Sequence, residues 1–132
     1  MINQQMNAIG KLTPQPWMIA AETKALFRAL QAGGKEARFI GGCVRNALFG
    51  LPVKDIDIAT SETPHRVLKL LGVASIKAIP TGIEHGTVTA VINSIHYEIT
   101  TLRIDVESLG RRATVVYTDD WVADALRRDF II

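Results

Sequence analysis

Two aspartates separated by one isoleucine are the residues best suited to chemistry in this sequence. Asp55 and Asp57 alternate with Ile56 and Ile58, so in a β-strand both carboxylates lie on one face and both isoleucines on the other. Residues two apart in a strand are about 6.5–7 Å apart, and two-metal phosphoryl-transfer sites hold their ions about 3.5–4 Å apart. Two aspartates can therefore hold a pair of Mg²⁺ ions, whose remaining ligands would be water and nucleotide phosphates.

A glycine pair precedes the aspartates and suits an anion. Gly41 and Gly42 follow an apolar run, residues 37–40, and residues 44–49 can form a short helix directly after them. Glycines let a ligand approach the backbone closely, and the free amide groups at the start of a helix attract negative charge. This order of strand, glycine turn and helix predicts a phosphate-binding turn. Taken alone, a glycine pair is most often a plain turn, and an Asp-x-Asp pattern is most often a solvated strand face.

A third carboxylate is expected on a β-hairpin. Residues 87–92 and 95–101 form two strands around the turn Asn93-Ser94. In the second strand Glu98 points away from the face of Ile99 and Tyr97. If the isoleucine faces of both acidic strands pack on helices, Glu98 shares the open face of the sheet with the two aspartates. It is then either a third catalytic carboxylate or the partner in a cross-strand salt bridge.

The elements that must position these groups predict an α+β fold. Helices are expected over 17–32, 44–49 and 64–71, the last capped by Thr63 and ended by Gly72. Strands are expected over 37–40, 55–58 and 73–79 besides the hairpin, with loops over 80–86 and 103–118. The second loop is either mobile and able to fold over a nucleotide or an RNA end, or plainly solvated. We expect a small mixed or antiparallel sheet, with the three helices on one face and the other face open and acidic. Trp121 is expected to face the core from a final helix.

Length, charge and cysteine content set further bounds. The chain has 132 residues and a net charge of +2, which fits one domain and permits a nucleic-acid partner without arguing for one. We expect an N-terminal arm over 1–16 and a head domain over 17–132. Cys43 is the single cysteine, which excludes an internal disulfide and favours the cytoplasm; it is expected to be a small buried residue. No stretch is apolar for the roughly 18 residues of a membrane span.

The two motifs together resemble one enzyme family. The stretch from Gly41 to Thr60, GGCVRN followed by DIDIAT, is similar to the head domain of class II tRNA nucleotidyltransferases, the CCA-adding enzymes, and of the related bacterial poly(A) polymerases, within the DNA polymerase β-like superfamily. Residues 98–103 resemble the family's Glu-x-Thr-Thr-x-Arg strand end. Residues 127–130, Arg-Arg-Asp-Phe, resemble its nucleotide-binding signature. The resemblance extends from residue 37 to residue 130.

The resemblance implies a function for each matched position. Asp55 and Asp57 would hold two Mg²⁺ ions, with Glu98 completing the cradle. Gly41, Gly42, Arg45 and Arg128 would bind the triphosphate of CTP or ATP, and Asp129 would accept a hydrogen bond from the ribose. The implied reaction transfers CMP or AMP to the 3′ end of tRNA.

Three departures from the family pattern leave alternatives open. Asn46 stands where aspartate is usual, Ile131 stands where threonine is usual, and the chain has no neck, body or tail after the head. We therefore expect an isolated catalytic head. A poly(A) polymerase head, a nucleotide-binding or metal-binding fragment that is inactive by itself, and a transferase acting on a small molecule are the alternatives.

Overall fold

The computed structural model describes residues 15–51, 55–106 and 114–121. Its helices and 3₁₀ turns are α2 (Pro16–Ile19), α3 (Ala21–Leu30), η1 (Gln31–Gly33), α4 (Gly42–Leu48), α5 (Pro64–Val73) and η2 (Ile83–His85). Its strands are β1 (Ala37–Ile40), β2 (Ile56–Thr60), β3 (Lys77–Gly82), β4 (Thr87–Ile92), β5 (Ile95–Thr101), β6 (Arg103–Val106) and β7 (Thr114–Tyr117).

Five of the strands form one mixed sheet in the order β1-β2-β5-β4-β3. The pair β2–β5 is parallel, and the other three neighbouring pairs are antiparallel. The predicted hairpin is confirmed, because β4 and β5 pair around Asn93 and Ser94, both of which have positive φ. The predicted α+β class with a small mixed sheet is also confirmed.

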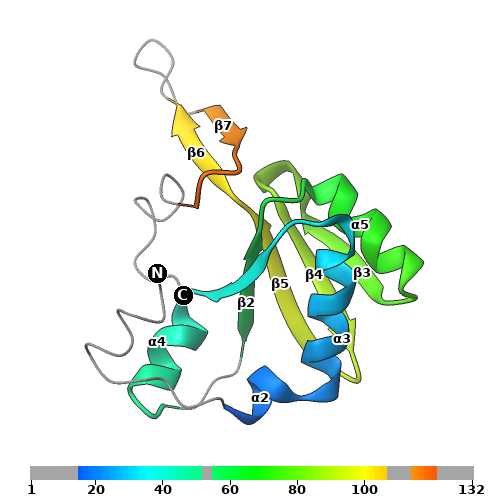
Figure 1. The fold of residues 1–132 in the computed structure, drawn as a ribbon. Coiled ribbons are helices and arrows are strands. Elements are labelled where there is room, and N and C mark those ends of the chain that lie inside the picture. Colours follow the sequence, from blue (N-terminus) through cyan, green and yellow to red (C-terminus); the bar gives the residue numbers. More distant parts are fainter. Residues whose placement is uncertain (1–14, 52–54, 107–113, 122–132) are drawn as a thin grey trace.

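The hydrophobic core lies between this sheet and the helices α3 and α5. The two helices lie side by side on one face of the sheet (Figure 1). Alternate residues of the central strands face them, among them Ile58 and Ile99, which are 0% and 1% exposed. Helix α4 stands apart from this pair, at the end of β1. The sheet therefore buries one face under two helices, as its alternating sequence predicted, but the prediction that the helix after the glycine turn shares this face was wrong.

The helix predicted over 17–32 is broken in two at Ala20. Ala20 has an extended backbone, φ −60° and ψ 149°, between α2 and α3. The hydroxyl of Thr23 donates a hydrogen bond of 2.5 Å to the carbonyl oxygen of Trp17. In an unbroken helix the carbonyl oxygen of Trp17 would accept from a backbone amide one turn later, and here the side chain of Thr23 takes that place. The single long helix was therefore wrong.

The predicted strand over 73–79 was also wrong in its first half. Helix α5 starts as expected, with the side chain of Thr63 accepting from the amide of Arg66, but it continues through Gly72 to Val73. Ser75, at φ 59°, takes the left-handed position after the helix end that we assigned to the glycine. Strand β3 consequently starts at Lys77 and extends into the segment predicted as a loop.

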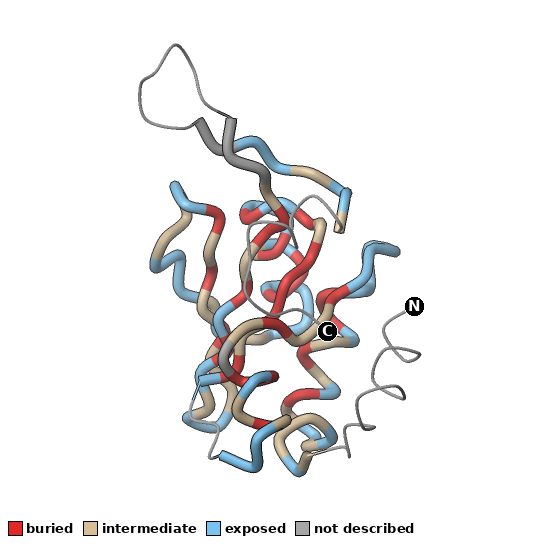
Figure 2. The backbone as a smooth tube through the Cα atoms, turned by 90° about the vertical axis from the view of Figure 1, so that its left-hand side faces the viewer, coloured by how far each residue is buried: buried red, intermediate tan, exposed pale blue. Residues whose placement is uncertain are grey.

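The loop predicted over 103–118 contains a two-stranded ribbon. Strands β6 and β7 pair antiparallel, and Figures 1 and 2 show the ribbon projecting from the body of the molecule. Val116 and Tyr117 are 43% and 40% exposed. The loop prediction was wrong because it overlooked two local strand patterns: residues 103–106 alternate polar and apolar side chains, and residues 114–117 are β-branched or aromatic.

The face opposite the helices is open only in part. Ile40, Ala59 and Leu102 form a second buried cluster, and Trp121 packs against it. Ile40 is the Cα partner of Asp57 across β1 and β2, so this cluster begins beside the acidic strand. The expectation of a wholly open acidic face was therefore wrong at the β1 corner, where Trp121 covers it.

Candidate acidic site on the sheet

Asp57 and Glu98 lie side by side on the face opposite the helices. They are Cα partners across the parallel pair β2–β5, and neighbouring strands are about 4.8 Å apart. Asp57 is half-buried and Glu98 is exposed. Residues 56 and 58 of β2, and 97 and 99 of β5, face the core instead. The structure thus brings these two predicted carboxylates together, while their catalytic roles stay predictions.

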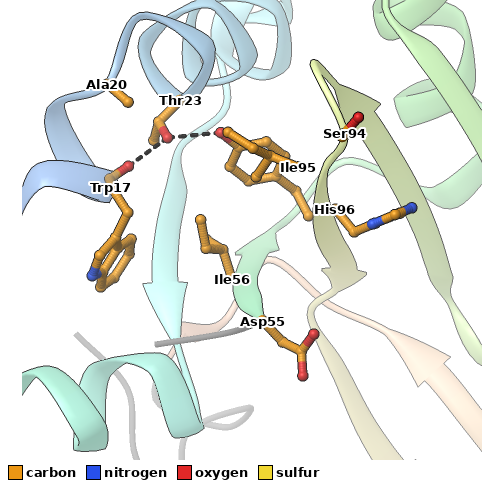
Figure 3. A pocket seen from close by; sticks show the side chains of 9 residues that line it. Trp17, Ala20, Thr23, Asp55, Ile56, Ser94, Ile95 and His96 are labelled. Atoms are coloured by element: carbon orange, nitrogen blue, oxygen red, sulfur yellow. Dashed lines mark hydrogen bonds between the residues drawn. The ribbon is translucent and has the colours of Figure 1, made fainter. Parts of the chain in front are cut away.

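Asp55 lies just before β2 rather than within it. Its side chain is exposed, and it lies at the edge of a cavity of about 320 Å³ between the start of β2, the start of β5 and the α2–α3 junction (Figure 3). The cavity is lined by Trp17, Ala20, Thr23, Asp55, Ile56, Ser94, Ile95, His96 and Tyr97. Asp55 is therefore accessible to a ligand on the same side of the molecule as the β5 hairpin turn.

Gly41 forms the turn between β1 and α4, as the sequence predicted. Its φ of 73° and ψ of −146° suit glycine and disfavour residues with a side chain. A Cβ atom at Gly41 would lie 3.4 Å from Oδ2 of Asp57. The turn is therefore next to the Asp57 carboxylate, and Gly42 is the first residue of α4.

Cys43 is buried, as expected, and contacts the strands behind the site. Its thiol donates to the carbonyl oxygen of Ile40 at 3.1 Å and lies 3.7 Å from the carbonyl oxygen of Asp57. Burial is the main cause that raises the pKa of the thiol, and the negative charge of Asp57 adds to it. Cys43 is therefore a protonated thiol at neutral pH, without the character of a nucleophile.

Arg45 is exposed on α4, two residues after Cys43. Its Nε donates to Oδ1 of Asn46 at 3.4 Å, and the carbonyl oxygen of Asn46 accepts from the amide of Leu51 at 2.7 Å. Asn46, the departure from the family pattern, therefore makes hydrogen bonds near the end of α4 with its side chain and its backbone.

Arg128 and Asp129 lie outside the described residues, as does the rest of the final helix expected after Trp121. The segment before them is held against β1: Lys35 pairs with Asp119 at 3.3 Å, and the guanidinium of Arg38 lies 4.2 Å from the ring centroid of Trp121. The expectation that Trp121 faces a core is confirmed. The contact of Arg38 with Trp121 was missed, because Trp121 is far along the sequence and no local pattern predicts the contact.

The metal-binding prediction can be tested against the donor groups. Across residues 15–51, 55–106 and 114–121, no three His, Cys, Asp or Glu side chains form a ready metal cluster. The neighbouring carboxylates of Asp57 and Glu98 do fit a hard divalent cation, provided that phosphate oxygens and water complete its shell. The donor set therefore suits an ion that arrives with a nucleotide rather than one held by the protein alone.

Comparison with known proteins gives one matching family and several relatives. Residues 37–132 match the sequence profile of the family described as "Poly A polymerase head domain". The human "CCA tRNA nucleotidyltransferase 1, mitochondrial" is 44% identical over 110 residues, which make up 83% of this chain and 25% of that protein. The "CCA-adding enzyme" of Bacillus cytotoxicus is 41% identical over 108 residues, 80% of this chain and 26% of that one.

A solved structure has the same fold. The CCA-adding enzyme of Bacillus stearothermophilus in complex with CTP superimposes with a TM-score of 0.70 at 34% identity, covering 87% of this chain and 26% of that one. The chain thus spans about a quarter of the length of the relatives it matches. Separately, none of the helices in the described part of the chain is long and apolar enough to cross a membrane.

Proposed function

This chain belongs to the poly(A) polymerase head-domain family, and on that premise we propose that it is the head of a template-independent RNA nucleotidyltransferase. The enzyme would add CMP and AMP, taken from CTP and ATP, to the 3′ end of tRNA. The observation that carries the proposal is the Asp57–Glu98 pair on neighbouring parallel strands, with the Gly41 turn beside Asp57. Relatives named as CCA-adding enzymes, one of them in complex with CTP, support the substrate class.

In the proposed reaction the RNA 3′-hydroxyl attacks the α-phosphorus of the nucleotide. The new P–O bond forms as the bond from the α-phosphorus to the oxygen that bridges to the β-phosphate breaks. Pyrophosphate leaves with the electron pair of that bond, and the proton of the 3′-hydroxyl passes to water. Asp55 and Asp57 would hold two Mg²⁺ ions, with Glu98 as a third carboxylate. When bound, Mg²⁺ would stabilise negative charge on the attacking and leaving oxygens.

The other proposed roles belong to groups around this acidic site. Gly41 and Gly42 would let the triphosphate approach the backbone, while Arg45 and Arg128 would donate forked hydrogen bonds to phosphate oxygens. Asp129 would accept a hydrogen bond from a ribose hydroxyl. Exposure of Arg45 on α4 is compatible with such a role.

Two alternatives can be tested. A poly(A) polymerase head is favoured by the description of the matching family. A nucleotide-binding or metal-binding head that is inactive by itself is the second alternative, and CTP binding without transfer would support it. A full-length form can be assayed with CTP and ATP on a tRNA that lacks its 3′ end. A poly(A) polymerase should incorporate AMP alone, whereas a CCA-adding enzyme should incorporate both CMP and AMP.

Calorimetric titration of the 132-residue chain tests the proposal directly. CTP and ATP are titrated with and without Mg²⁺ into the wild type and into an Asp55→Ala, Asp57→Ala double variant. We expect Mg²⁺-dependent binding of both nucleotides to the wild type and none to the variant, with the circular dichroism of the two unchanged. Binding without Mg²⁺, or equal binding by the folded variant, would contradict the assigned roles. In a full-length form, either single substitution should abolish transfer.

The cytoplasmic location expected from the single cysteine remains part of the proposal. The human relative is named as mitochondrial, so fractionation of cells that express the tagged full-length protein is the measurement that decides.

A further inference from the structure

The thiol of Cys43 connects α4 to the part of the sheet that carries Asp57. Cys43 is 2% exposed on the first turn of the helix. Its Sγ lies within sulfur hydrogen-bond distance of two carbonyl oxygens, 3.1 Å from that of Ile40 and 3.7 Å from that of Asp57. Ile40 and Asp57 are Cα partners across β1 and β2. One side chain therefore reaches both members of the residue pair that contains the proposed metal-holding aspartate.

The same turn also lies near the carboxylate of Asp57. Gly41 lies close enough that a Cβ atom there would be 3.4 Å from Oδ2 of Asp57. The start of α4 thus lies against the strands that carry Asp57, with Sγ of Cys43 3.7 Å from the carbonyl oxygen of Asp57 and the Gly41 turn near its carboxylate. A displacement of α4 would change the distance between the glycine turn and the carboxylate.

We propose that Cys43 is a positioning residue, which holds the Asp57 carboxylate at a fixed distance from the Gly41–Gly42 turn so that one nucleotide triphosphate can contact both. The proposal rests on the proposed function of Asp57 and the turn. Cys43 does not touch the substrate. It acts through its single S–H, which lies between the carbonyl oxygens of the two strands and can be shared by them, and its burial keeps water from competing for the same oxygens.

The variants Cys43→Ala, Cys43→Ser and Val44→Ala separate positioning from simple stability. Alanine removes the donor, and serine keeps one. Val44 is 0% exposed on the same helical turn, but its side chain has no donor for the Asp57 carbonyl, so Val44→Ala is a matched loss of packing. Thermal unfolding, Mg²⁺-dependent CTP affinity and the three-bond couplings that report χ1 of Asp57 are measured for all four proteins.

We expect Cys43→Ala to weaken CTP binding by about three- to tenfold, the effect of one lost hydrogen bond. We expect Cys43→Ser to stay within about twofold of the wild type, and Val44→Ala to bind CTP normally despite an equal or larger loss of thermal stability. The χ1 couplings of Asp57 should indicate one rotamer in the wild type and averaging in Cys43→Ala alone.

Each remaining outcome has a definite meaning. If CTP affinity falls in both alanine variants in proportion to thermal stability, Cys43 is only a packing residue and the proposal is wrong. If the wild type binds no CTP, the proposed nucleotide function of this chain fails. The χ1 couplings of Asp57 then test by themselves whether Cys43 positions Asp57. Averaging of Asp57 in Cys43→Ala but not in Val44→Ala would still support the proposal, and unchanged couplings would overturn it.

Discussion

The two faces of the five-stranded sheet use the same strands for different purposes. On the helix face, the side chains of Ile58, Tyr97 and Ile99 are at most 1% exposed. On the other face, one residue away along each strand, Asp57 is half-buried and Glu98 is exposed. Because burial supplies most of the folding free energy, the helix face can hold the fold while the acidic face keeps charged groups accessible. Substitutions on the two faces should therefore separate stability from function.

The largest expected effect is the loss of stability on the helix face. Ile99→Ala should lower the free energy of unfolding by about 2–5 kcal/mol, since it leaves a cavity in a closed core. Its neighbour Glu98→Gln should stay within about 0.5 kcal/mol of the wild type, as is usual for exposed positions. Urea unfolding of both variants measures the difference. Equal losses of unfolding free energy in the two variants would contradict the view that the helix face alone stabilises the fold.

The reverse order is expected for activity. Glu98→Gln keeps the shape of the side chain and removes its charge, so in a full-length form it should lower nucleotidyl transfer by about 10- to 100-fold, the range for groups that support a metal site. Thr100→Val, on the same face of the same strand, is the control and should leave the rate unchanged. If the Glu98→Gln enzyme transfers normally, Glu98 serves only as a cross-strand partner.

Local patterns in the sequence predicted several strands and the placement of the two carboxylates. The strands at 37–40, 87–92 and 95–101 have the expected bounds, because strong alternation and the Asn93-Ser94 turn are local signals. The glycine turn beside Asp57 and the shared face of Asp57 and Glu98 were also predictable, since side-chain alternation fixes the face.

What the sequence could not reveal depends on contacts between distant segments. The hydroxyl of Thr23, which donates to the carbonyl oxygen of Trp17 across the helix break, is also 2.9 Å from the hydroxyl of Tyr97, which lies far along the chain. The cover over Ile40 comes from Trp121, far along the chain. Neither contact has a local signature, and the contact of Trp121 closes the acidic face at the β1 corner.

A smaller effect concerns a polar group within the helix face. The hydroxyls of Tyr97 and Thr23 are 2.9 Å apart and buried. Tyr97→Phe should cost about 1 kcal/mol at pH 7 by removing this hydrogen bond, as measured by urea unfolding. The cavity-forming Ile99→Ala should cost more, which would rank packing above hydrogen bonding on this face.

The same substitution should also have a pH dependence of known sign. Burial is the main cause that raises the pKa of Tyr97 above its usual 10.0. In alkali the unfolded chain therefore loses this proton before the folded chain does, so wild-type stability falls as pH rises above about 10. Phenylalanine has no such proton, so the gap between the wild type and Tyr97→Phe should narrow from pH 9 to pH 11. A constant gap would mean that Tyr97 ionises equally in both states.

The smallest effect is expected at the corner where Trp121 covers the acidic face. Arg38→Met keeps the apolar stem but removes the cation over the Trp121 ring, and should cost about 0.5–1 kcal/mol. Lys35→Met, which removes an exposed pair at 3.3 Å, should cost less and should lose its effect in high salt. Urea unfolding at low and high salt compares the two. Ile40 at this corner is 3% exposed, but the contacts that cover the corner lie at the surface. We therefore expect this corner to unfold more easily than the helix face. A loss from Arg38→Met as large as that from Ile99→Ala would show instead that the covered corner is part of the main core.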